Sequence, residues 1–417
     1  MPLDITRGLA EIDPTVPSNI PRQGPRVWLL CTLLFFATAL CFLDRQVLSV
    51  LAPQITEEFG MSNTVYSRVV FAFVLSYTVM TSLGGRLMDA LGTRLGLGLA
   101  VGFWTVASAA HAFVIGPITL GVARFFLGVG EGPCFPAATK GVMEWVDKKN
   151  RALAIGFANG GSAVGAIVAP PLTVWVATVY GWRGAFAVTA VLGLIWVIAW
   201  WVFVPKPPKR SAAVRAPAVR FRDLLARPEV RRLIPARFFF DPVFYFYLFW
   251  IPQYLARERG MSLADIGKWF WIPWLALEIS NLGAGYCSDR LVRRGWAPRR
   301  ARLTLMLFAA LLTPASGLAV GAETPAVAIG LMSVLLFAHG IWIGNFITHL
   351  GESVGSHEVA TTVGLTGTCG GIAGMLSNLV IGPVVDHFSF TPIFMATAVV
   401  YPVAWIILRG RTPLNEK

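Results

Sequence analysis

Long apolar segments run through the whole of this 417-residue chain, and they restrict the folds that it can adopt. A helix needs about 20 mainly apolar residues to cross the hydrocarbon core of a bilayer. Twelve such segments lie between connections rich in charge, proline or glycine: 27–52, 66–88, 95–114, 118–145, 152–178, 182–204, 233–255, 264–288, 301–320, 325–350, 359–385 and 391–408. The sequence therefore predicts an all-α integral membrane protein with twelve transmembrane helices.

Basic residues gather in the connections on one side of these segments. Nine lie between the sixth and seventh segments, from Lys206 to Arg232, and six lie between the eighth and ninth, from Arg290 to Arg302. The connections on the other side hold little beyond Arg183, Arg257 and Arg259. Because lysine and arginine are enriched in cytoplasmic loops, both termini are predicted to face the cytoplasm.

An internal repeat divides the chain into two parts. The second segment is followed by GRLMDALGTR (Gly85 to Arg94), and the eighth by GYCSDRLVRR (Gly285 to Arg294). Asp89 and Asp289 are 200 residues apart in matching positions. The repeat predicts two six-helix bundles related by pseudo-two-fold symmetry. The expected division is a cytoplasmic tail at 1–26, bundles at 27–204 and 233–408, a basic cytoplasmic linker at 205–232 and a second tail at 409–417.

Several classes of protein are excluded. The net charge of +13 does not indicate a nucleic-acid partner, because the basic residues follow the loops and no nucleic-acid-binding motif accompanies them. The five cysteines form no CxxC pair, so neither a metal site nor a disulfide framework is expected. HExxH, GxSxG with partner residues and glycine-rich phosphate loops are missing, which excludes an enzyme with one of these catalytic motifs. No catalytic residues and no cofactor are expected.

Four ionisable residues interrupt apolar segments of the first bundle. They are Asp44 and Arg45 in the first segment, and Arg124 and Glu131 in the fourth. Placing a charged side chain at mid-membrane costs at least about 2.5 to 3.5 kcal/mol of insertion free energy. Each of the four residues is therefore expected to have an ion-pair partner, a water-filled cavity or a function. Arg124 and Glu131 share a helix face and can share a pocket or pair, whereas Asp44 and Arg45 point in different directions. One interpretation is structural ion pairs. The other assigns the arginines to an anion, which a guanidinium binds through its planar fork, and the acids to protons.

Further polar residues are candidates for a binding cavity. Asn159 and Ser162 lie among glycines of the fifth segment. A stripe on one face of the tenth segment predicts a cavity wall suited to a sugar, and consists of His339, Trp342, Asn345 and His349. Asp241 precedes an aromatic run from Phe244 to Trp250, most of which is expected to face lipid or the membrane interface. The roles of Asp241, Glu278 and His349 stay open.

The two Gly-x-x-x-Asp motifs, one in each half, resemble the major facilitator superfamily, whose transporters are built from such repeats. The resemblance implies that Asp89, Arg94, Asp289 and Arg290 take part in conformational change. Ala90 departs from the family, which usually has a basic residue there. The charge contact of the first half is therefore expected to be weaker or to depend on Arg94.

Five segments resemble the anion:cation symporter family, and within it the bacterial hexuronate transporters. They are LDRQVLSVLAPQI (43–55), RFFLGVGEGPCFPAATK (124–140), NRALAIGFANGGSAVGAIVAPP (150–171), DPVFYFYLFWIP (241–252) and AHGIWIGNFIT (338–348). The resemblance implies proton-coupled uptake of a sugar acid by alternating access. It assigns proton coupling to Asp44 and Glu131 and the substrate carboxylate to Arg45. Arg124 would tune Glu131 or help to hold the anion, and Tyr77 matches a family tyrosine.

Two departures bear on the substrate. Cys134 stands where hexuronate carriers commonly have asparagine, which leaves the sugar acid open. An asparagine of the aldonate carriers is replaced near Gly367, which argues against a galactonate-type pocket. The prediction is a monomeric, multi-pass symporter of the bacterial inner membrane, with the proton as coupling ion and a small carboxylate as substrate. The alternative is an exchanger or uniporter of an aromatic, dicarboxylic or aldonic acid.

Overall fold

The computed structural model describes residues 25–147, 150–205, 221–355 and 358–410, and all regular secondary structure within these ranges is helical. The predicted tails and linker fall largely on residues 1–24, 206–220 and 411–417, which lie outside the described residues. The elements of the first half are α1 (Pro25–Glu58), α2 (Asn63–Leu91), α3 (Thr93–Ala110), η1 (His111–Phe113), α4 (Pro117–Glu131), α5 (Cys134–Trp145) and α6 (Arg151–Phe203). Those of the second half are α7 (Phe221–Ala226), α8 (Pro228–Phe249), α9 (Ile251–Arg259), α10 (Leu263–Trp269), α11 (Trp271–Arg293), α12 (Pro298–Leu312), η3 (Thr313–Gly321), α13 (Pro325–Glu352), α14 (Val359–His387) and α15 (Thr391–Arg409).

Eight helical segments of the described chain are long and apolar enough to cross a membrane. Three predicted segments are missing from this set, and each is divided in two. The fourth is divided into α4 and α5, which have 15 and 12 residues and are too short. The seventh is divided into α8 and α9 and the eighth into α10 and α11; α8 and α11 are long enough, with 22 and 23 residues, but they are not apolar enough. Each division lies at or just before a proline, namely Pro133, Pro252 and Pro273. Proline removes a backbone donor and clashes with the preceding turn, so it breaks or bends a helix.

The fifth and sixth predicted segments appear as one long element, α6. Gly181 lies inside it with φ of 73° and ψ of 170°, which is not helical. Glycine adopts a positive φ without the steric cost that a side chain imposes. The chain therefore turns back at Gly181, between the predicted ends at Thr178 and Trp182.

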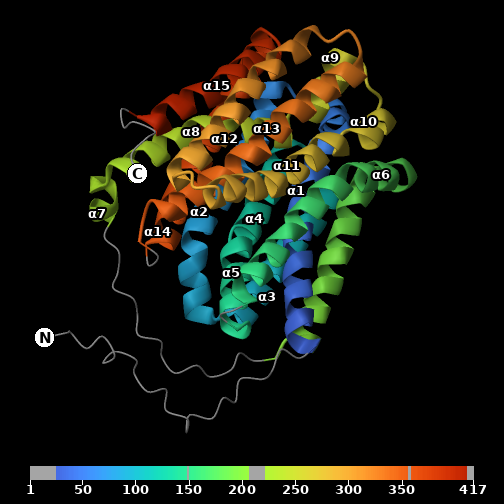
Figure 1. Cartoon of the computed structure of the whole chain (residues 1–417). Coiled ribbons are helices and arrows are strands. Elements are labelled where there is room, and N and C mark those ends of the chain that lie inside the picture. The colour runs from blue at the N-terminus through green and yellow to red at the C-terminus, as the bar shows by residue number, and fades with distance from the viewer. Residues whose placement is uncertain (1–24, 148–149, 206–220, 356–357, 411–417) are drawn as a thin grey trace, which may run out of the picture.

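Each half packs mainly within itself. In Figure 1 the blue-to-green helices of the first half lie together, and the yellow-to-red helices of the second half lie above them. In the first half α1 packs against α6 and α2 against α4; in the second half α11 packs against α13 and α8 against α14. Glycines permit this close contact: a Cβ at Gly161 would lie 1.8 Å from the Phe35 carbonyl oxygen, and one at Gly165 would lie 2.2 Å from that of Ala39.

The two halves meet along α2 and α14, and α1 also contacts α9 while α6 contacts α10 and α11. Large apolar side chains stay exposed on the outside, among them Ile115, Phe113 and Leu282 at 84%, 81% and 78%. Such a surface suits lipid. The four ionisable residues that interrupt the apolar segments of the first half lie inside instead: Asp44, Arg45, Arg124 and Glu131.

Candidate functional site

Four buried ionisable side chains form the centre of the first half. Asp44 and Arg45 lie on α1, and Arg124 and Glu131 lie on α4; none is more than 5% exposed. The aromatic and small residues of α2, α3 and α6 surround them. The structure therefore brings together the four residues that the sequence had singled out by their charge.

Arg45 pairs with Glu131. The guanidinium Nε donates to Oε2 of Glu131 at 2.8 Å, and Nη2 donates to the sulfur of Cys41 at 3.0 Å. The ring of Tyr77 on α2 lies 4.1 Å from the Arg45 Cζ, a cation–π distance. Oε1 of Glu131 is buried and accepts no hydrogen bond from the described residues. The carboxylate thus retains an acceptor for a proton or another donor.

Asp44 has a different set of partners. Its Oδ1 accepts a hydrogen bond from Ser108 on α3 at 2.9 Å, and the Ser108 hydroxyl lies 2.9 Å from that of Thr189 on α6. Adjacent residues on a helix point about 100° apart, so Asp44 and Arg45 reach different neighbours. Asp44 is held by neutral hydroxyls, and in the described chain it forms no ion pair within 4.0 Å.

Most of the hydrogen-bond donors of the Arg124 guanidinium have no partner among the described residues. Its Nη1 donates weakly to the backbone oxygen of Asp44 at 3.4 Å, while Nε and Nη2 are buried without a partner among the described residues. The rings of Phe73 and Phe186 lie 5.9 and 5.7 Å from its Cζ. Of the two arrangements expected for Arg124 and Glu131, a shared pocket or a direct pair, the direct pair is not found, because Glu131 pairs with Arg45.

Asn159 and Ser162 lie half-buried on α6. Ser162 donates to the backbone oxygen of Asn159 at 2.7 Å, one turn earlier on the same helix. The Asn159 Oδ1 is buried and has no partner in the described part of the chain. These two residues therefore make no hydrogen bond to the Arg45–Glu131 pair in this structure.

The polar stripe of α13 lies in the core of the second half, not on an exposed wall. His339, Trp342, Asn345 and His349 are all at most 6% exposed. His339 Nδ1 is 2.5 Å from the hydroxyl of Tyr401 on α15, and the Trp342 ring packs 5.6 Å from that of Phe240 on α8. Asn345 donates to the carbonyl of its own helix at Ile341. The cavity wall expected for this stripe is replaced by side chains of α8 and α15.

The aromatic run of α8 also differs from expectation. Phe246, Tyr247, Phe249 and Trp250 are at most 1% exposed, so they do not face lipid. α8 is enclosed because α13, α14 and α15 all contact it. Apolarity alone did not distinguish a lipid-facing helix from one buried in the bundle.

Three interacting residues were missed in the sequence. Arg237 forms an ion pair with Asp241 at 3.0 Å on α8, and the i, i+4 spacing of opposite charges was a signal available for finding it. Cys41 contacts both members of the Arg45–Glu131 pair. Its position one turn before Arg45 was the only hint. Lys140 is the third, and it bears on the conformational motif.

The structure gives each of the repeated motif residues a partner. Asp89 pairs with Lys140 of α5 at 2.7 Å, so the charge contact of the first half does not depend on Arg94. Arg94 instead donates to the Val204 carbonyl at the end of α6 at 2.6 Å. In the second half Asp289 pairs with Arg302 of α12 at 2.7 Å. Arg290 donates to the hydroxyl of Tyr286 on its own helix.

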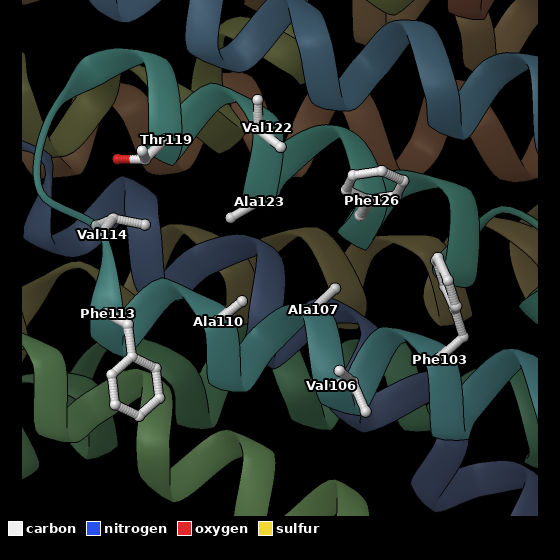
Figure 2. Close-up of a pocket in the computed structure, with 10 residues that line it drawn as sticks. All are labelled: Phe103, Val106, Ala107, Ala110, Phe113, Val114, Thr119, Val122, Ala123 and Phe126. Atoms are coloured by element: carbon white, nitrogen blue, oxygen red, sulfur yellow. The ribbon is translucent and has the colours of Figure 1, made fainter.

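A separate groove lies on the outside of the first half, between α3 and α4. Figure 2 shows its lining, which is apolar except for the hydroxyl of Thr119. Its volume is about 490 Å³, and Val106 and Phe113 on its rim are 71% and 81% exposed. This groove suits lipid chains and offers no charged group to an anion.

The long apolar helices and the buried charges together define a class of protein, the polytopic membrane proteins. Residues 34–378 match the model of the Major Facilitator Superfamily, so the chain belongs to this superfamily. It is a multi-pass protein of the inner membrane and a transporter, not an enzyme.

Two relatives and one solved structure illustrate the similarity. The hexuronate transporter of Escherichia coli K12 is 29% identical over 93% of this chain and 95% of its own length. The D-galactonate transporter of Escherichia coli O6:H1 is 27% identical over 95% of this chain and 98% of its own. The solved structure is that of a bacterial homologue of the human lysosomal transporter Spinster, in an inward-facing and occupied conformation. It superposes with a TM-score of 0.74 at 18% identity, and the match covers 93% of this chain and 96% of the homologue. The last likeness concerns the fold alone.

Proposed function

We propose that this protein is a secondary active transporter that takes up a sugar acid of the hexuronate type together with protons. The observation that carries the proposal is the Arg45–Glu131 pair at 2.8 Å, fully enclosed in an apolar bundle beside the ring of Tyr77. A buried arginine can exchange one carboxylate for another, and a sugar acid supplies that second carboxylate. The names of the relatives agree with such a substrate.

We further propose twelve membrane crossings with both termini in the cytoplasm. The three proline-interrupted segments and the two arms of α6 on either side of Gly181 are counted as crossings in addition to the unbroken spans. The bundles would then comprise residues 27–204 and 233–408, joined by the basic linker 205–232. The basic connections between bundle segments support this orientation.

Coupling follows from charge balance at Arg45. While Glu131 is ionised it neutralises Arg45, and a substrate carboxylate would add an uncompensated negative charge. When Glu131 takes up a proton, Arg45 is left without its partner, and a buried unpaired charge is strongly unfavourable. Binding of the proton and binding of the substrate anion therefore favour each other. Asp44, held only by hydroxyls and close to the Arg124 side chain, is the proposed second proton site.

The remaining candidates have supporting roles in this proposal. Tyr77 covers the guanidinium and forms one wall of the anion site, and Arg124 adds positive charge behind it. Asn159 and Ser162 would reach the sugar from α6 when the halves rock. His339, Trp342 and Asn345 would support the opposite wall from the core of the second half. Protons are the only coupling ion that the proposal needs.

Uptake of labelled glucuronate and galacturonate into proteoliposomes tests the proposal. We expect accumulation that depends on an inward proton gradient in the wild type and is lost in Glu131→Gln. The exposed Glu57→Gln serves as the matched control, because it makes the same chemical change outside the site. Gradient-independent equilibration would instead indicate a uniporter or exchanger. If neither acid enters, the proposed substrate class is wrong.

A further inference from the structure

A second ion pair, on α8, lies in the half opposite Arg45. Arg237 Nε donates to Oδ2 of Asp241 at 3.0 Å, and Arg237 Nη1 donates to the Thr366 hydroxyl of α14 at 3.2 Å. The side chains are 16% and 14% exposed, compared with 6% and 0% for Arg45 and Glu131. An ion pair within a membrane bundle gains little over apolar packing, so a partly accessible one suggests contact with a ligand.

The packing of α14 leaves room for this pair. A Cβ at Gly370 would lie 1.7 Å from Oδ2 of Asp241, and one at Gly374 would lie 2.2 Å from the ring of Tyr245. Neither position can hold a side chain while α8 keeps its place. The face of α8 with Arg237, Asp241 and Tyr245 is therefore fitted to a glycine-lined stretch of backbone.

Tyr245 connects this pair with the site of the first half. Its ring stacks on that of Phe249 at 6.3 Å, and the Phe249 ring lies 6.0 Å from that of Phe73 on α2. The Phe73 ring in turn lies 5.7 Å from the Arg45 Cζ. Gly371, which follows Gly370 on α14, also approaches the first half. A Cβ at Gly371 would lie 2.6 Å from the hydroxyl oxygen of Thr78, the residue after Tyr77. A series of ring contacts thus leads from Tyr245, one turn after Asp241, to Arg45 in the other half, and each arginine is paired with its own carboxylate.

We propose that Arg237 is a second substrate anchor, which binds an acidic group at the end of the sugar acid opposite the one held by Arg45. Each arginine then exchanges its internal carboxylate, Glu131 or Asp241, for one carboxylate of the substrate. A dicarboxylic sugar acid satisfies both anchors, whereas a hexuronate satisfies one. This inference rests on the proposed function and narrows its substrate class.

The two arginine anchors, Arg45 and Arg237, also link substrate binding to movement of the halves. A ligand that engages Arg45 and Arg237 together connects α1 with α8, and both arginines must reach it at once. Such a ligand stabilises the conformation in which the halves close around it. A ligand with one carboxylate stabilises this conformation less.

Competition uptake tests the inference. Proteoliposomes take up labelled galacturonate in the presence of unlabelled glucarate, a dicarboxylic sugar acid, or unlabelled glucuronate. We expect glucarate to compete about tenfold more strongly than glucuronate, equivalent to one charge-assisted contact of about 1.4 kcal/mol. In Arg237→Gln this ratio should fall to about one while galacturonate uptake persists. Arg237→Lys should give an intermediate ratio, because an ammonium keeps the charge but not the fork.

The exposed Arg293→Gln is the control and should keep the wild-type ratio. A merely structural role of Arg237 would lower uptake of every sugar acid without changing the ratio, and that result would overturn the inference. Equal competition by both acids in the wild type would overturn it as well, while leaving hexuronate transport intact. Failure of the proposed function looks different, because then the wild type takes up no sugar acid at all, glucarate included.

Discussion

The two ends of the α2–α14 contact are held together very differently. At the Asn63 end of α2, the Asp386 carboxylate accepts four hydrogen bonds, from the backbone and side-chain groups of Asn63 and Thr64, at 2.6 to 3.0 Å. Arg257 of α9 adds bonds to Asn63 at 3.0 Å and to Thr56 at 3.2 Å. Toward the Leu91 end, the described residues contribute one hydrogen bond between the halves, between the hydroxyls of Ser82 and Thr368 at 2.8 Å, and it is exposed.

This difference indicates which end is closed. Asp386 places a negative charge at the N-terminus of a 29-residue helix, where the unpaired backbone N–H groups and the helix dipole favour an anion. A single exposed hydroxyl pair contributes little by comparison. The halves are therefore joined firmly at the Asn63 end and loosely at the Leu91 end. With the proposed topology, the structure is closed to the outside.

One reporter serves to test the comparison. Ser67 is 1% exposed and lies at the Asn63 end. In Ser67→Cys, with the exposed Cys287 and the half-buried Cys369 replaced by serine, the rate of reaction with a membrane-impermeant maleimide measures how often this end opens. Each variant below is compared with this parent.

The largest effect is expected from Gly382→Leu. A Cβ at this position would lie 2.5 Å from the Asn63 backbone oxygen and 2.7 Å from the Ser67 side chain, so α2 and α14 cannot stay in contact. We expect the maleimide rate to rise more than tenfold. Gly364→Leu, where a Cβ meets nothing within 4 Å, is the control on the same helix. An unchanged rate in Gly382→Leu would mean that the contact does not limit opening.

Asp386→Asn should have the next largest effect. The amide keeps the shape of the carboxylate but loses the charge and places a donor toward N–H groups. Because Asp386 is largely exposed, we expect a loss of about 1 kcal/mol, or a rise of about fivefold in the maleimide rate. A lower rate would show that Asp386 does not hold this end closed.

Arg257→Gln should give a rise of about threefold, because two hydrogen bonds between the halves are lost and the principal carboxylate contact stays. Arg259→Gln is the matched control. Arg259 donates to Tyr254, Ala319 and Ala322, all within the second half. Equal effects of the two substitutions would indicate general destabilisation instead of loss of contact between the halves.

Thr368→Val should have the smallest effect. It removes the exposed bond to Ser82 while keeping the volume of the side chain, and we expect less than a twofold change in the maleimide rate at Ser67→Cys. A large change would contradict the view that the two ends differ in strength.

Much of the fold could be predicted from local properties of the chain. The apolar segments, the repeated Asp89 and Asp289 motifs and the unusual charges Asp44, Arg45, Arg124 and Glu131 are all visible in the sequence. The breaks at Pro133, Pro252 and Pro273 follow from local chemistry too, although the expected segments ran through them. Their effect was underestimated because apolarity extends across each proline.

Partners could not be predicted in the same way. The sequence indicated that Arg124 and Glu131 share a face, yet the partner of Glu131 comes from α1, 86 residues away. Asp89 likewise pairs with Lys140 instead of Arg94. The helical periodicity predicts on which side of its helix a side chain lies. Which other helix packs against that side depends on the tertiary structure.

By itself the sequence determined that the chain must enter a bilayer as apolar helices, and that its few internal charges need partners or tasks. Both conclusions follow from the solvation free energy of each side chain, which depends on its chemistry and not on its place in the fold. Only the tertiary structure decided that Arg45 forms an ion pair with Glu131, and that the α13 stripe and the α8 aromatic residues lie in the core. It also decided that Asp386 joins the two halves at the Asn63 end of α2. Those outcomes depend on distances of a few ångströms between helices far apart in the chain, which no local pattern specifies.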